Sequence, residues 1–116
     1  VMSRIKSENY FHAEPEKLNC AQSILKGFQR EFGIDDSTIA QFRAWGGGRV
    51  EGGTCGALFA ANYLLEKRGL PKINAEFTQR AGAERCIDIK KENKTPCVTC
   101  VKIADEIIER IISESK

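Results

Sequence analysis

Five cysteines are the residues in this sequence whose type and spacing could support redox or metal chemistry. The chain has 116 residues, and the cysteines are Cys20, Cys55, Cys86, Cys97 and Cys100. Their number is odd and the sequence shows no export signal, so a disulfide framework of the secreted kind is not expected. The cysteines instead indicate metal binding or reversible thiol–disulfide chemistry.

Helical periodicity runs through most of the chain and determines where these cysteines should lie. Apolar residues recur at spacings of three and four, which predicts helices at about 15–32, 36–45, 55–68, 74–86 and 96–112. No segment of useful length alternates apolar and polar residues as a strand would. The sequence therefore predicts an all-α fold, a single-domain bundle of about five helices over residues 1–116. A glycine-rich loop interrupts it, and residues 1–13 form an N-terminal arm or short helix.

Capping residues indicate where the expected helices begin and end. Pro15 suits the first turn of the first helix, and Gly33 should stop that helix. Thr54 is the expected N-cap of the third helix, and Thr95 that of the last. Cys86 is then expected at the end of the fourth helix.

Helix direction should bring the cysteines together. If the five helices alternate in direction, the first, third and fifth run parallel, and their starts lie beside the end of the fourth. All five cysteines then converge on one end of the bundle. Three helix N-termini there each present about half a positive charge, which favours thiolates. We therefore expect the thiols at helix starts to be alkylated at lower pH than an unperturbed cysteine, with Cys55 and Cys97 ahead of Cys86.

The cysteine neighbourhoods resemble a known family. Asn19-Cys20-Ala21-Gln22, Cys55-Gly56-Ala57, Arg85-Cys86 and Cys100-Val101 together are similar to the motif of the C-GCAxxG-C-C family. That family is described as redox-active and as a candidate for an iron–sulfur or similar prosthetic group. The resemblance covers the chain from Asn19 to the last helix and puts Cys20, Cys55, Cys86 and Cys100 at the four cysteine positions. Ala60 departs from the motif, which has Gly there, and Cys97 is an additional cysteine.

Two functions are compatible with these cysteines, besides simple packing as small buried residues. The first is an iron–sulfur or other metal–thiolate centre for electron transfer, with zinc as an alternative metal. Its ligands would be Cys20, Cys55, Cys86 and Cys100, with Cys97 as the alternative to Cys100. The second is a metal-free dithiol–disulfide protein that uses Cys97 and Cys100 as its redox pair. Either would work with an oxidoreductase or an electron-transfer protein, and the sequence leaves open whether the chain is itself an enzyme.

The glycine-rich loop before Cys55 is the second candidate binding feature. Its glycines should let the backbone approach a group bound beside Cys55, and the candidates are Gly47, Gly48, Gly52 and Gly53. A P-loop is excluded because Gly53 stands where the phosphate-binding lysine is needed. Covalent haem at Cys97 and Cys100 is excluded because Val101 replaces the histidine of CxxCH.

Charge and hydropathy exclude two further classes of function. The formal net charge is only +2, whereas a nucleic-acid-binding domain is typically strongly basic. No apolar run approaches the roughly 18 residues that a membrane span requires. We therefore expect no nucleic-acid partner, no membrane partner and a cytoplasmic location.

Overall fold

Helices make up nearly all the regular structure in the described part of the chain. The computed structural model describes residues 6–11, 18–45, 54–85, 88–89 and 97–114. Within these ranges the elements are η1 (Ser7–Asn9), α1 (Cys20–Gly27), α2 (Gln29–Phe32), α3 (Asp36–Gln41), η2 (Phe42–Trp45), α4 (Gly56–Lys67), α5 (Asn74–Ala81) and α7 (Cys97–Glu114). Apart from helices, these ranges contain two isolated β-bridges, Phe11–Leu18 and Thr54–Arg85. The all-α fold predicted from the sequence is confirmed.

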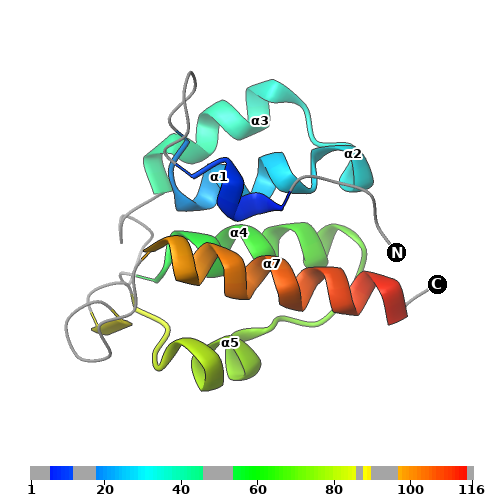
Figure 1. Ribbon diagram of the computed structural model, residues 1–116. Coiled ribbons are helices and arrows are strands. Elements are labelled where there is room, and N and C mark those ends of the chain that lie inside the picture. Colours follow the sequence, from blue (N-terminus) through cyan, green and yellow to red (C-terminus); the bar gives the residue numbers. More distant parts are fainter. Residues whose placement is uncertain (1–5, 12–17, 46–53, 86–87, 90–96, 115–116) are drawn as a thin grey trace.

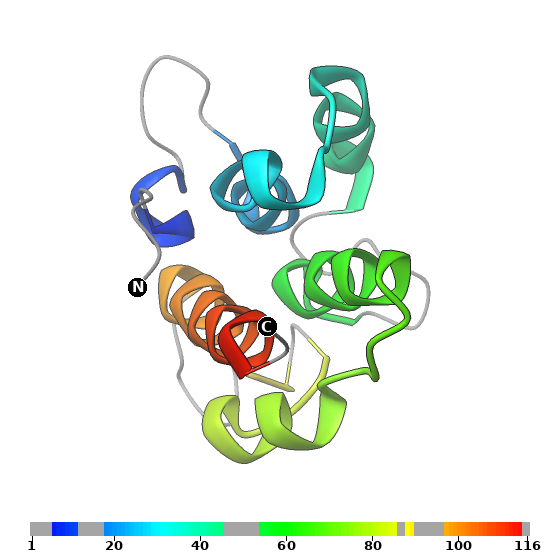
Figure 2. The same cartoon turned by 90° about the vertical axis from the view of Figure 1, so that its right-hand side faces the viewer.

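Three parallel helices form the centre of the fold. Helices α1, α4 and α7 run in the same direction and each packs against the other two, whereas α3 and α5 run back along opposite sides (Figure 1). Figure 2 looks along the three helix axes and shows α3 beside α1 and α5 below α7. The N-terminal ends of α1, α4 and α7 therefore share one end of the molecule, as the alternating helix directions predict.

One continuous hydrophobic core lies between these helices. The largest fully buried side chains are Phe28, Phe77, Ile24, Leu25, Leu58, Leu64, Leu65, Ile89, Ile107 and Ile108. On α4, Ala57, Ala60 and Ala61 are also fully buried, and such small side chains allow neighbouring helices to approach closely. None of the described helices is long and apolar enough to cross a membrane.

The first predicted helix begins later than expected and is divided. Helix α1 begins at Cys20 because the Asn19 side chain accepts the Gln22 backbone N–H at 2.8 Å. The Gln22 side chain accepts the Asn19 N–H at 3.1 Å in return, which completes a capping box. Phe28, with φ −114° and ψ 15°, then separates α1 from α2. The prediction of one helix starting near Pro15 is wrong over the described residues, and 12–17 lie outside them.

Two other predicted helix ends also differ in the structure. Helix α4 has Cys55 rather than Thr54 as its N-cap. Helix α5 ends at Ala81 because Gly82 takes a left-handed conformation with φ 99°. Residue 86 is therefore not the end of α5, and the expectation that Cys86 ends the fourth helix is wrong. Gly33, with φ 65°, ends α2 as predicted.

The N-terminal segment docks across α1 and α7. The Ser7 backbone N–H donates to the buried Asp105 carboxylate at 2.8 Å, and Lys6 pairs with Glu109. Ser7 also lies so close to Gly27 that a Cβ added there would be 2.0 Å from the Ser7 Oγ and 3.0 Å from its Cα. A glycine at position 27 is therefore required for η1 to pack on α1.

Substitution of Gly27 tests this close approach. In an ordinary helix, Gly→Ala stabilises by up to about 1 kcal/mol. Here we expect Gly27→Ala to destabilise the protein by about 1–3 kcal/mol, because the new methyl group overlaps Ser7. Urea denaturation measures the change, and the double variant Gly27→Ala/Ser7→Gly should recover part of it. A stabilised Gly27→Ala protein would contradict this packing.

Candidate functional site

Three buried cysteines lie at the starts of the three parallel helices. Cys20 is the first residue of α1, Cys55 is the N-cap of α4, and Cys100 is in the first turn of α7. Their exposed fractions are 3%, 4% and 2%. Because α1, α4 and α7 are parallel and mutually packed, all three cysteines lie at the same end of the molecule (Figure 1).

The thiols of Cys55 and Cys100 contact each other across the α4–α7 interface. Both are free thiols, and they are hydrogen-bonded. This hydrogen bond raises the pKa of Cys55 far above its ordinary value of 9.0, with further contributions from burial and from the charge that Cys100 would carry. The backbone N–H groups of Ala57 and Leu58 act in the opposite direction, but they do not outweigh these effects.

The pKa of Cys55 corrects the expectation drawn from helix dipoles. An exposed thiol at a helix N-terminus has a lowered pKa. Cys55 lies at a helix N-terminus but is buried, and its hydrogen bond with the Cys100 thiol favours the protonated form. The prediction that Cys55 is alkylated at unusually low pH is therefore wrong.

Labelling as a function of pH tests the raised pKa. In the reduced, metal-free protein we expect Cys55 to be alkylated by iodoacetamide only well above pH 9.0, later than an unperturbed thiol. Because the pKa is higher in the folded state than in the unfolded state, the folded state should also lose stability as the pH rises above about 9. Cys100→Ala should move the labelling of Cys55 to lower pH. Labelling of Cys55 near pH 7 in the unsubstituted protein would contradict the raised pKa of Cys55.

The other predicted site residues fall outside the described part of the structure. These are Cys86, the side chain of Cys97, and the loop glycines Gly47, Gly48, Gly52 and Gly53. Among the described residues, no three Cys, His, Asp or Glu side chains are grouped closely enough to hold a metal ion. The four-cysteine ligand set therefore remains a prediction, and Cys55 with Cys100 is the pair that the structure brings into contact.

A short segment whose position the sequence did not indicate lies beside Cys55. The backbone N–H of Cys55 donates to the Glu84 carbonyl at 2.8 Å, and Thr54 forms an antiparallel bridge with Arg85. The chain can turn toward α4 here because Gly82 ends α5. Gly82 was the available signal in the sequence, but a glycine near a helix end does not show which element the following residues will meet.

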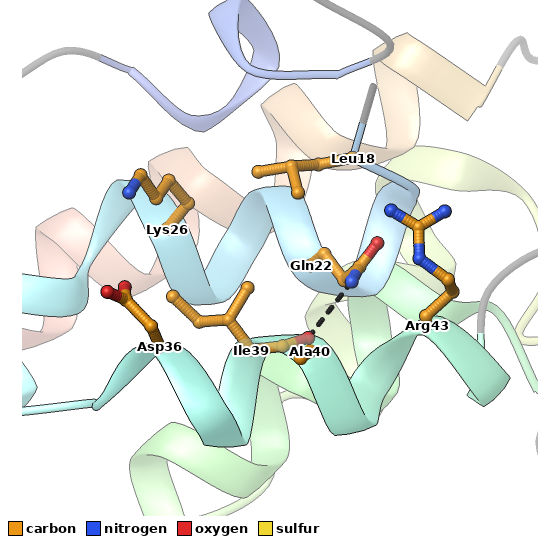
Figure 3. A pocket seen from close by; sticks show the side chains of 7 residues that line it. All are labelled: Leu18, Gln22, Lys26, Asp36, Ile39, Ala40 and Arg43. Carbon is orange, nitrogen blue, oxygen red and sulfur yellow. Dashed lines mark hydrogen bonds between the residues drawn. The ribbon is translucent and has the colours of Figure 1, made fainter. Parts of the chain in front are cut away.

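A groove between α1 and α3 is the second feature that could bind a ligand. Its volume is about 330 Å³, and its lining residues are Leu18, Gln22, Lys26, Asp36, Ile39, Ala40 and Arg43 (Figure 3). The Gln22 side chain at its floor donates to the Ile39 carbonyl at 3.0 Å and accepts from the Asn19 N–H. This buried amide is satisfied within the protein, and none of the three described cysteines lines the groove.

Comparison with known proteins relates most of the chain to one family. Residues 18–111 match the family model described as "Putative redox-active protein (C_GCAxxG_C_C)". This range includes all five cysteines. No curated protein and no solved structure matches the chain.

Proposed function

The chain belongs to the C-GCAxxG-C-C family, which is described as redox-active, and from this premise we propose that its redox centre is built from the cysteines at the starts of α1, α4 and α7. The contact between the Cys55 and Cys100 thiols carries this proposal. Two buried thiols that meet across a helix interface can share a metal ion or form a disulfide, and ordinary core packing requires no such meeting.

A metal–thiolate centre is the form that we favour. Thiolates are the donors of iron–sulfur clusters and of many zinc sites, so the chemistry of the donor set fits such a group. Cys55 and Cys100 would hold it together with Cys20 and Cys86, and Cys97 is the alternative to Cys100. When bound, an iron–sulfur cluster supplies one-electron transfer.

The surrounding protein would support a negatively charged centre. The N-terminal ends of α1, α4 and α7 each present positive partial charge and backbone N–H groups to this end of the bundle. Burial of Cys20, Cys55 and Cys100 excludes water and strengthens these interactions. We also propose that glycines 47, 48, 52 and 53 let the preceding loop approach the same centre.

A metal-free dithiol is the second candidate, and the pairing of two thiols favours it. Cys55 and Cys100 would exchange with a disulfide of a partner protein. In that reaction the two thiols lose two protons and two electrons and form one S–S bond, while the partner's disulfide is reduced to two thiols. The pair expected from the sequence, Cys97 and Cys100, lies at positions i and i+3 of α7 and could react in the same way.

Either form requires a redox partner. We propose an oxidoreductase or an electron-transfer protein, which would deliver or remove the electrons. Reduced thiols persist in the reducing cytoplasm, which is the location that we propose.

Anaerobic purification distinguishes the two forms. We expect protein made with ample iron to be brown, with visible absorption that oxygen or chelators bleach and with bound iron and sulfide. A colourless protein with stoichiometric zinc would still support a metal–thiolate centre. A metal-free protein that loses thiols two at a time on exposure to a disulfide would support the dithiol. A protein that binds no metal and keeps all its thiols unchanged under both treatments would overturn the proposal.

A further inference from the structure

A chain of side-chain hydrogen bonds links the middle of α4 to the segment beside Cys55. The Asn62 side chain in α4 accepts the Ile73 backbone N–H at 3.0 Å, and it donates to the Asn74 side chain at 2.7 Å. The Asn74 side chain in turn donates to the Glu84 carboxylate at 3.0 Å. Asn62, Asn74 and Glu84, here called the amide–carboxylate chain, thus connect α4, the start of α5 and the residues that follow α5.

The same segment returns to α4 through the backbone. The Glu84 carbonyl accepts the Cys55 N–H at 2.8 Å, and Arg85 forms an antiparallel β-bridge with Thr54. Cys55 and Asn62 are seven residues apart, about two helical turns, so they lie on the same face of α4. Residues 73–85 are therefore fastened to one face of α4 at two points, the second of which is Cys55 itself.

We infer that the amide–carboxylate chain positions the proposed redox centre by holding residues 84–85 against the N-terminus of α4, where the Glu84 carbonyl accepts the Cys55 N–H. This inference rests on the proposed function, because it takes Cys55 as part of the redox centre. Asn62, Asn74 and Glu84 are positioning residues, because they act on the centre through the backbone at Cys55.

The exposure of the Asn74–Glu84 hydrogen bond, the last of the chain, argues for positioning rather than for general stability. The Asn74–Glu84 bond is exposed, and an exposed hydrogen bond contributes little to the free energy of unfolding. Residues that orient metal ligands, by contrast, typically change metal affinity about 10–100-fold when they are substituted. The effect of breaking the chain should thus be larger on the centre than on the fold.

Two measurements on four variants test the inference. Asn74→Ala and Glu84→Ala break the chain, Glu84→Gln keeps an acceptor oxygen, and Gln79→Ala changes an exposed residue of α5 outside the chain. The first measurement is amide hydrogen exchange at Cys55 in the reduced, metal-free protein, which reports the bond to the Glu84 carbonyl. The second is the affinity of the same proteins for added Zn²⁺.

We expect Asn74→Ala and Glu84→Ala to speed exchange at Cys55 at least about tenfold and to weaken Zn²⁺ binding about 10–100-fold. Glu84→Gln and Gln79→Ala should stay within about twofold of the unsubstituted protein in both measurements. Unchanged exchange at Cys55 in Asn74→Ala would overturn the inference, as would faster exchange with unchanged Zn²⁺ affinity. If the unsubstituted protein binds no Zn²⁺, iron or other metal and forms no disulfide, the proposed function fails, and the inference fails with it.

Discussion

Replacing Cys100 with alanine is expected to abolish the redox chemistry of this protein while leaving its helices folded. Cys100 is 2% exposed and contacts the Cys55 thiol, so it serves either form of the proposed centre. In the metal-bound form the variant loses a ligand, and we expect a fall of more than about 100-fold in metal affinity. In the dithiol form, the Cys55–Cys100 disulfide cannot form. Loss of the buried sulfur should cost only about 1–2 kcal/mol of stability.

Two further variants provide a packing control and distinguish the metal-bound form from the dithiol form. Val101→Ala removes packing from the adjacent, fully buried position without removing a thiol, so it should lower stability but leave metal affinity unchanged. Cys20→Ala should abolish binding if the centre is a four-cysteine metal site, and it should leave a Cys55–Cys100 dithiol active. Metal content, visible absorption and thiol counts measure all three variants. Full metal and redox capacity in Cys100→Ala would refute the assignment of Cys100.

The shared position of three cysteines at one end of the bundle could be predicted because it depends on helix order. Apolar periodicity located the main helices, and short connections make successive helices alternate in direction. That alternation predicts the same end of the bundle for Cys20, Cys55 and Cys100, since each stands at the start of one of the three parallel helices. The contact between Cys55 and Cys100 depends instead on how α4 and α7 are rotated about their axes, which the spacing of their apolar residues defines too coarsely.

Helix ends were harder to predict because competing local signals were present. Pro15 suggested an early start for the first helix, but Asn19 and Gln22 carry the capping box that starts α1. Gly82 could have remained within a helix at modest cost, yet it takes a left-handed conformation and ends α5. Because α5 ends there, Glu84 lies beside the start of α4 and not within α5. Its carbonyl can therefore accept the Cys55 N–H.

The direction of the Cys55 pKa shift shows a limit of arguments from helix dipoles. A dipole argument treats each thiol separately and assumes that water can reach it. In the structure the hydrogen bond to Cys100 and the burial of Cys55 both favour the protonated form, and together they exceed the effect of the α4 N-terminus. These opposing effects depend on tertiary contacts, so only the structure could give their balance.

Phe77→Ala is expected to produce the largest loss of stability among alanine substitutions in α5. Phe77 is fully buried and Ala81 is 2% exposed, and these are the two buried residues of this eight-residue helix. Truncating a buried phenylalanine costs about 3–5 kcal/mol, a large part of the 5–15 kcal/mol that stabilises a typical domain. The ion pairs Arg80–Glu106 and Arg110–Glu76 also join α5 to α7, but they are exposed and each contributes at most about 1 kcal/mol. They cannot hold α5 in place once Phe77 is removed.

Amide exchange in the Phe77→Ala variant distinguishes local unfolding of α5 from unfolding of the whole protein. Helix α5 leads into residues 84–85 beside Cys55, so its loss should speed amide exchange at Cys55 as well as throughout α5. Exchange in the middle of α1, around Ile24 and Leu25, should change less, because these residues pack in the core among α1, α4 and α7. Urea denaturation and residue-resolved exchange measure the two effects, with Arg80→Ala as the control expected to cost less than 1 kcal/mol. A loss below about 1 kcal/mol in Phe77→Ala would mean that α5 is held by its surface ion pairs rather than by its buried aromatic side chain.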